Sequence, residues 1–527
     1  MLPAAVKKPR VPRGVAACAS GLLALVALGA PAAHAAAPGP TAAAGAPVAA
    51  DAPAAADAPA APLRFHACEL EHPLRLTLLA AECALLSVPE NPHAPGGRRV
   101  DLSVVRVPAI SRRKAPDPLF VLAGGPGQAA GSFYAATAGA FGRILRERDI
   151  VLVDQRGTGR SNPLNCPAEV QNPQESASPQ VIAASTRACL ASLAARADVT
   201  WYTTSLAVAD LESVRAALGA PRIDLYGASY GTRVAQQYLR RYPQHTRALI
   251  LDGVVPVGRA VGADTALVAE AALLDILARC AKDAPCRAAF GDPAQDYRSV
   301  RAAVSGRALP VKLADPASGL ATQREFGTEA LASVLRLSTY ASEYAALLPL
   351  MLHAAAARAD YAPLAAQQLL FERAYAGELA TGMHNSVVCA EDVPFFDEKS
   401  LDRAQFAATY LGTLQLQGLE SVCRIWPHGP VDADLHAPLT SEVPALLLSG
   451  SDDPVTPPAW GAQALRSFPA GVGVVLEGFG HGQLTAPCVD RLMAQFLQRA
   501  SAQGLEVGCT RLARPMPFFT SLNGPPP

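Results

Sequence analysis

The sequence predicts a mostly parallel α/β sheet with crossover helices and a large helical insertion. Short, nearly continuous apolar runs bounded by Gly, Pro or Asp recur along the chain, as in PLFVLAGG at 118–125 and RIDLYGAS at 222–229. Strands buried on both faces have this composition. Helical patterns separate several of these runs, and strand alternating with helix is typical of a parallel sheet. The alternation stops after Val255 and resumes near Val443, which indicates an insertion.

Each expected element has a recognisable pattern. Two strands, ECALLSVPE and RRVDLSVVRVPA, come before the buried runs, and the second shows alternation and β-branched residues. The buried runs are expected to be strands at 118–125, 149–155, 222–229, 247–255, 443–453 and 472–481. Helical periodicity marks SLAVADLESVRAALGA at 205–220, YGTRVAQQYLRRYP at 230–243 and DRLMAQFLQRA at 490–500.

The insertion defines the expected domain organisation. Residues 256–442 are rich in alanine, leucine and helical periodicity, so we expect a helical cap that precedes the acid-bearing strand. The core then comprises 63–255 and 443–527, the latter with a C-terminal tail. The 45 basic and 45 acidic side chains of the 527-residue chain cancel. We therefore expect neither nucleic acid nor an anionic membrane surface as a partner, and the oligomeric state stays open.

The N-terminal segment has the pattern of an export signal. Basic residues precede an apolar run that is short for a membrane span, and Ala33-His34-Ala35 matches an A-x-A cleavage site. We expect a signal peptide at 1–35; an uncleaved anchor is the alternative. Residues 36–62 lack aromatic side chains and have almost no large aliphatic ones, so they are expected to be a disordered Ala/Pro linker. The mature protein would be secreted or periplasmic.

Ten cysteines follow the signal, and an even number in an exported chain indicates disulfides. They fall into five local clusters of two, so sequential pairing is the simplest expectation. The expected pairs are Cys68 with Cys83, Cys166 with Cys189, Cys280 with Cys286, Cys389 with Cys423, and Cys488 with Cys509. No C-x-x-C or H-E-x-x-H spacing occurs, so neither a metal nor a cofactor is expected.

GASYG at 227–231 lies between a predicted buried strand and a predicted amphipathic helix. A nucleophile elbow has this position, because two glycines allow the sharp turn that exposes the serine hydroxyl. The following helix N-terminus supplies backbone N–H donors and a positive dipole. Ser229 is therefore a candidate nucleophile, and a structural turn serine is the alternative.

A serine nucleophile needs a histidine base and a carboxylate that holds the base in its working tautomer. SGSDDPVTPP ends one predicted strand in two aspartates, and GFGHG ends the next in His481. The order Ser, Asp, His is that of α/β hydrolases. Asp453, before Pro454, is the expected acid, and Asp452 is the fallback. The other histidines considered for the role lie in predicted helices, loops or the cap: His245, His353, His384, His428 and His436.

FVLAGGPGQAAG follows an early strand, where a donor for the oxyanion is expected. The amide of Gly125 can approach the site closely, and with the amide of Tyr230 it would form the oxyanion hole. The alternative is a dinucleotide-binding loop with Asp154 as the ribose acid. Its glycine spacing departs from G-x-G-x-x-G, which disfavours that interpretation.

Five motifs in order, AGGPGQAAG, VDQRGTGRS, GASYGT, SGSDDPVTPP and GFGHG, resemble the α/β-hydrolase serine peptidases of the proline iminopeptidase and tripeptidyl aminopeptidase group. The resemblance covers Pro118 to Arg499. It implies an α/β-hydrolase fold with Ser229, Asp453 and His481 as the catalytic triad. VDQRGTGRS would be a structural loop beside the site, with no catalytic role for Arg156. Ala123 stands where proline iminopeptidases often have histidine. The long cap and its disulfides look more like the secreted tripeptidyl aminopeptidases, a group that also contains esterases.

The expected function is a secreted serine aminopeptidase acting on free N-termini of small peptides. A carboxylesterase acting on small acyl esters is the alternative, and a catalytically silent binding protein is a third. An aminopeptidase needs a carboxylate for the substrate's ammonium group. Glu391 and Asp392, in HNSVVCAEDVPFF beside Cys389, are the candidates. The alternative is that both acids face solvent or pair with arginines of the cap.

Overall fold

The structure, a computed structural model, describes residues 62–167, 178–397, 399 and 401–525. All the residues that the structure describes belong to one compact unit. The predicted signal peptide at 1–35 lies outside the described residues, as does the predicted linker at 36–62 except for its last residue.

One nine-stranded sheet forms the centre of this unit. Its order is β1-β2-β3-β5-β4-β6-β7-β10-β11; the strands from β5 to β11 are parallel, and β1, β2 and β3 join antiparallel at one edge. The strands are β1 (His66–Glu71), β2 (Leu78–Pro89), β3 (Arg99–Val107), β4 (Leu119–Leu122), β5 (Ile150–Val153), β6 (Ile223–Ala228), β7 (Thr246–Asp252), β10 (Ala445–Gly450) and β11 (Val472–Leu476). The predicted mostly parallel α/β fold is confirmed.

Both faces of the sheet are covered, which explains the continuous apolar runs. Helices α3 (Thr204–Leu218) and α4 (Tyr230–Arg241) pack on one face, and α1 (Ala130–Phe141) and α16 (Val489–Arg499) pack on the other. Every residue of β4, β5, β6 and β10 is buried as a result. Two further helices of this part are α2 (Pro179–Leu193) and α15 (Pro458–Leu465).

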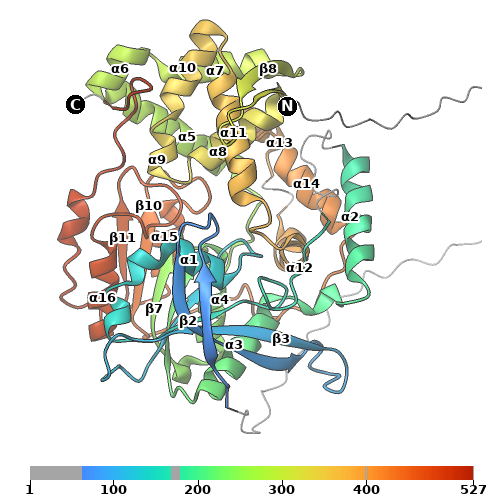
Figure 1. The fold of residues 1–527 in the computed structure, drawn as a ribbon, viewed down its shortest axis with the longest axis vertical. Coiled ribbons are helices and arrows are strands. Elements are labelled where there is room, and N and C mark those ends of the chain that lie inside the picture. The colour runs from blue at the N-terminus through green and yellow to red at the C-terminus, as the bar shows by residue number, and fades with distance from the viewer. Residues whose placement is uncertain (1–61, 168–177, 398, 400, 526–527) are drawn as a thin grey trace, which may run out of the picture. The chain divides into compact units, whose positions relative to one another are not determined.

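The segment between β7 and β10 is mainly helical, and Figure 1 shows many of its helices grouped together. Most of these helices share a separate core around Leu273, Leu335 and Leu352, whereas Met383, Val387 and Cys389 pack into one core of the sheet. The helices are α5 (Thr265–Lys282), α6 (Ala284–Phe290), α7 (Pro293–Val304), α8 (Thr328–Ser338), α9 (Ser342–Ala345), α10 (Leu348–Arg358), α11 (Ala362–Tyr375), α12 (Thr381–Glu391), α13 (Arg403–Ala407) and α14 (Leu414–Cys423).

Three strands were not predicted. The cap contains an antiparallel hairpin of β8 (Leu309–Ala314) and β9 (Ala321–Phe326), which an all-helical interpretation of this region missed. Edge strand β1 was missed as well, because most of its side chains are exposed or half-buried and it has no apolar run. Pairing with β2, rather than local composition, makes this segment a strand.

The structure pairs the ten cysteines as Cys68–Cys83, Cys166–Cys189, Cys280–Cys286, Cys389–Cys423 and Cys488–Cys509. Five disulfides are typical of an oxidising compartment. Peptide mapping of the purified protein without reduction is expected to recover these five linked pairs; free thiols at most positions would contradict export. In the described part of the chain, no helix has both the length and the apolar character of a membrane span.

Candidate active site

Ser229 lies on the sharp turn between β6 and α4. Its backbone has φ 54° and ψ −120°, a strained conformation for a non-glycine residue that persists where the surroundings enforce it. The Ser229 amide donates a hydrogen bond to the Asp252 carbonyl at 2.8 Å. A Cβ atom on Gly227 would overlap the Gly231 carbonyl, and one on Gly231 would overlap the Leu122 carbonyl. Close packing of β4, β6 and α4 therefore requires both glycines.

His481 follows β11 and faces Asp453, which follows β10. Its Nδ1 atom lies 2.8 Å from Asp453 Oδ2. The Asp453 carboxylate is only 2% exposed and accepts hydrogen bonds from the Val455 and Thr456 amides and the Thr456 hydroxyl, all at 2.8 Å. This arrangement leaves Nε2 of the imidazole as the proton acceptor.

The structure distinguishes the two aspartates that the sequence offered as the acid of the triad. Asp452 faces away from the histidine: its Oδ2 atom lies 3.0 Å from Arg279 of cap helix α5, and its Oδ1 atom accepts from the Ser451 hydroxyl at 2.7 Å. Asp453 is therefore the acid beside His481, and Asp452 contacts the cap.

Ser229 follows β6, and His481 packs against the end of the neighbouring strand β7. Residues Ala228 and Asp252 pair across these strands, and a Cβ atom added to the next residue, Gly253, would lie 3.0 Å from Cε1 of His481. Within the described residues, no hydrogen bond joins the serine hydroxyl to Nε2. Such bonds are often long without substrate and shorten in the substrate complex.

The loop after β4 lies directly against the serine. A Cβ atom on Gly124 would lie 3.1 Å from the Ser229 Cβ atom, and Gly125 has φ 107°, which favours glycine. Neither the Gly125 amide nor the Tyr230 amide donates a hydrogen bond to another described residue. Both donors are thus free to bind an oxyanion, and the N-terminus of α4 adds its positive dipole.

The cap supports this loop, which the sequence did not indicate. The Ala380 amide donates to the Gly127 carbonyl at 2.9 Å, and His384 Nδ1 lies 3.2 Å from the Pro126 carbonyl. Burial lowers the pKa of His384, so the neutral imidazole can donate from Nδ1. The cap histidine therefore helps to hold the loop that follows Ala123.

Two further residues near His481 were not predicted from the sequence, Asp252 and Tyr340. The Asp252 carboxylate is fully buried, accepts from the Gln483 amide at 2.9 Å and from the Tyr226 hydroxyl at 2.8 Å, and thereby fixes the loop after His481. Burial raises the pKa of Asp252 to about 6. Tyr340 packs edge-on against the imidazole with ring centroids 5.3 Å apart. Only the ending LILD of strand β7, in which an apolar run ends in an acid, could have signalled Asp252.

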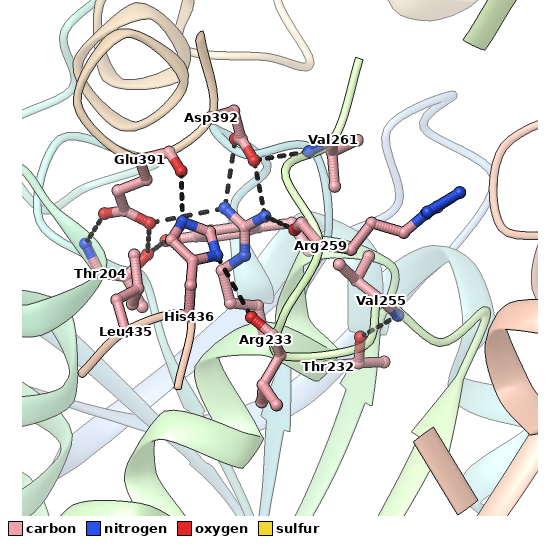
Figure 2. A network of polar contacts seen from close by, with 12 residues as sticks. Thr204, Thr232, Arg233, Val255, Arg259, Val261, Glu391, Asp392, Leu435 and His436 are labelled. Atoms are coloured by element: carbon pink, nitrogen blue, oxygen red, sulfur yellow. Dashed lines mark hydrogen bonds and ion pairs between the residues drawn. The ribbon is translucent and has the colours of Figure 1, made fainter. Parts of the chain in front are cut away.

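Glu391 and Asp392 lie in a buried network at the end of α12, away from solvent (Figure 2). Asp392 forms a bidentate ion pair with Arg233 of helix α4, at 2.6 and 3.1 Å, and accepts from the Val261 amide. Glu391 accepts from the amide and hydroxyl of Thr204, both at 2.6 Å. Binding of a substrate ammonium by either acid stays a prediction.

The dinucleotide alternative is not supported by the geometry. The Asp154 carboxylate accepts hydrogen bonds from the Gly131 and Arg160 amides, so it holds two loops together. Arg156 is buried and pairs with Asp210 at 2.7 Å, in agreement with the structural role expected for it. In the part of the chain that the structure describes, no group of three His, Cys, Asp or Glu side chains could hold a metal ion.

The pKa of His481 gives a prediction. Burial lowers this pKa, but the charge and hydrogen bond of Asp453 outweigh burial, so the pKa lies above its usual value. A base must be neutral, so kcat/KM should fall on acidification, with a midpoint above the ordinary histidine value of about 6.5. A pH–rate profile that is flat between about pH 5 and 8, with chemistry rate-limiting, would contradict this role for His481.

Two family models match the chain. Residues 117–279 match the model described as alpha/beta hydrolase fold, and residues 408–509 match the one described as TAP-like protein. The first segment contains Ser229, and the second contains Asp453 and His481. The chain has the α/β-hydrolase fold. The two matched segments, together with the geometry at Ser229, support the assignment of this chain as a serine hydrolase.

Curated relatives agree with this assignment. Serine protease Hip1 of Mycobacterium tuberculosis is 30% identical over 43% of this chain and 46% of its own length. Carboxylesterase B of the same organism is 30% identical over 39% and 43%. Tripeptidyl aminopeptidase of Streptomyces coelicolor is 27% identical over 34% and 36%. The chain thus matches less than half the length of each.

Proposed function

We propose that this α/β hydrolase is an exported serine aminopeptidase that releases short peptides or single residues from free N-termini. The observation that carries the proposal is the site itself: a strained serine at the elbow, a histidine on a buried aspartate, and two unpaired amides. The match of the second segment to a TAP-like protein model and the names of two relatives favour peptides.

The proposed mechanism uses one residue for each task. Nε2 of His481 takes the proton of the Ser229 hydroxyl while the serine oxygen forms a bond to the scissile carbonyl carbon. The Gly125 and Tyr230 amides stabilise the resulting oxyanion. The imidazolium, stabilised by Asp453, then protonates the leaving amine as the C–N bond breaks. Water, activated by the same imidazole, hydrolyses the acyl-enzyme and restores the serine.

Recognition of a free amino terminus requires negative charge near the substrate. In the buried network, the single positive charge of Arg233 faces two carboxylates, Glu391 and Asp392, so their ionised forms leave one negative charge in excess. A substrate ammonium would balance it, which supports a part for these acids in amine recognition. Glu391→Gln is then expected to raise KM for free-amine peptides more than it raises KM for a small acyl ester, which has no amino group.

A carboxylesterase is the second candidate, because Carboxylesterase B has the same 30% identity to this chain as the protease, over a slightly shorter part of it. The same triad and oxyanion amides would act on a small acyl ester, with an alcohol as the leaving group. The aminopeptidase is preferred because the excess negative charge of the Glu391–Asp392 network could pair with a substrate ammonium, a group that a small acyl ester lacks.

A substrate panel tests the choice. We expect the purified protein to cleave a free-amine tripeptidyl p-nitroanilide and, with lower kcat/KM, aminoacyl p-nitroanilides, and to be nearly inactive on the N-acetylated tripeptide. A p-nitrophenyl butyrate control reports on the triad alone. Equal activity on free and acetylated peptides, or activity on the ester only, would favour the esterase. Inactivity on every compound, including a fluorophosphonate probe, would favour the catalytically silent binding protein.

A further inference from the structure

A short chain of hydrogen bonds leads from the cap to the residue after the nucleophile. Glu391 Oε2 accepts a proton from the Thr204 hydroxyl at 2.6 Å, and the Thr204 oxygen lies 2.7 Å from the Tyr230 hydroxyl. Threonine has one hydroxyl proton, and an ionised Glu391 receives it. The Tyr230 hydroxyl must then donate to Thr204. The carboxylate therefore sets the direction of both bonds.

These bonds fix a side chain whose backbone belongs to the site. Tyr230 is the first residue of α4 and is 5% exposed. One end of the residue is held by the elbow at Ser229, and the far end of its ring is held by Thr204. An oxyanion donor must lie about 2.7 to 3.1 Å from the developing charge. Holding both ends of Tyr230 keeps its amide in one direction.

The surroundings of Glu391 include several titratable groups (Figure 2). Arg233 lies 3.6 Å away, and His436 Nε2 lies 2.8 Å from the main-chain carbonyl of Glu391; Asp392 and Tyr230 are the other groups that face it. Burial raises the pKa of Glu391 to about 7, although Arg233 and the bonds from Thr204 oppose this shift. Protonated Glu391 would carry a hydrogen of its own and would no longer set the direction of the chain.

We propose that Glu391 is a positioning residue that acts through Thr204 to hold Tyr230, and with it the second oxyanion amide, in the orientation required for catalysis. This proposal rests on the proposed oxyanion role of the Tyr230 amide but not on the choice between peptide and ester. It separates two effects of Glu391: the excess charge of its network changes KM for amines, whereas the hydrogen-bond chain changes kcat for every substrate.

The test compares Glu391→Gln with Tyr230→Phe. The two bonds from Thr204 go to different oxygens of Glu391. Glutamine has an NH2 group in place of one of them, so one of these two positions loses its acceptor. Phenylalanine removes the other end of the chain and keeps the backbone amide. Each variant is expected to lower kcat on p-nitrophenyl butyrate at least about tenfold, less than the 10²–10³ for loss of an oxyanion donor. The ester KM should change less than about twofold, and the double variant should be no slower than the slower single variant.

The pH dependence of kcat/KM on the ester gives a second readout. On the acid side, log kcat/KM of the wild type should rise with pH with a slope greater than 1, because His481 and Glu391 must both lose a proton. In Glu391→Gln this slope should be 1. Thermal unfolding of each variant, measured alongside, identifies a variant that fails to fold; the other variant then provides the kcat test.

Three results with the ester would overturn the proposal. The first is an unchanged kcat for the ester in a folded variant. The second is a double variant whose loss in kcat equals the product of the two single losses. The third is an acid limb of the pH profile with the same slope in Glu391→Gln as in the wild type. A loss confined to KM of free-amine peptides would also overturn it, since Glu391 would then act on the substrate amine alone. Failure of the enzyme to cleave peptides would refute the aminopeptidase but leave the ester measurements intact.

Discussion

Ser229→Ala is expected to lower kcat by at least about 10⁴-fold on any substrate that the wild type cleaves, because triad members act as a unit and leave only residual catalysis when one is lost. The substitution removes one oxygen and leaves the elbow intact, since alanine can occupy the same turn with the same amide bond to Asp252. Steady-state kinetics on pure protein, with thermal unfolding measured in parallel, provide the test.

A matched serine serves as the control for this variant. Ser213 lies on α3, and its hydroxyl only donates to the Ala209 carbonyl one turn earlier, so Ser213→Ala should retain wild-type kcat. Labelling by a fluorophosphonate probe should reach Ser229 in the wild type and in the control, and should be lost in Ser229→Ala. Substantial turnover by folded Ser229→Ala would refute the nucleophile assignment.

Asp453→Asn is expected to have the second largest effect, a loss in kcat of about 10⁴-fold, because an asparagine amide stabilises the wrong tautomer of the histidine. The adjacent Asp452→Asn is a close control. Asp452 has comparable burial but pairs with Arg279 rather than His481, so its loss should alter stability and cap contacts while kcat changes less than about tenfold. The quantity to measure is the ratio of the kcat values of Asp452→Asn and Asp453→Asn.

One result with Asp453→Asn and Asp452→Asn would contradict the assignment of Asp453. If Asp452→Asn proves the slower enzyme on a small ester, the acid of the triad has been misassigned. A pH–rate profile of folded Asp453→Asn adds a check, since without the Asp453 charge the pKa of His481 should fall toward and below its usual value and move the acid limb with it.

The fold was largely predictable because parallel strands buried on both faces leave a local signature. Runs such as PLFVLAGG and RIDLYGAS match β4 and β6 closely, and the gap in the alternation matches the mainly helical segment before β10. Edge strand β1 and the β8–β9 hairpin left no such signature: their side chains are partly exposed, and pairing with a neighbouring strand makes them strands.

By itself, the sequence determined the α/β-hydrolase fold and the strand ends at which a nucleophile, an acid and a base would stand, since local hydrophobic pattern and motif order carry that information. Only the tertiary structure decided which neighbouring aspartate faces His481, that His384 of the cap supports the oxyanion loop, and that Glu391 bonds Thr204. The reason is physical: these contacts join residues 28 to 258 positions apart, and side-chain direction at such contacts depends on how packed elements meet.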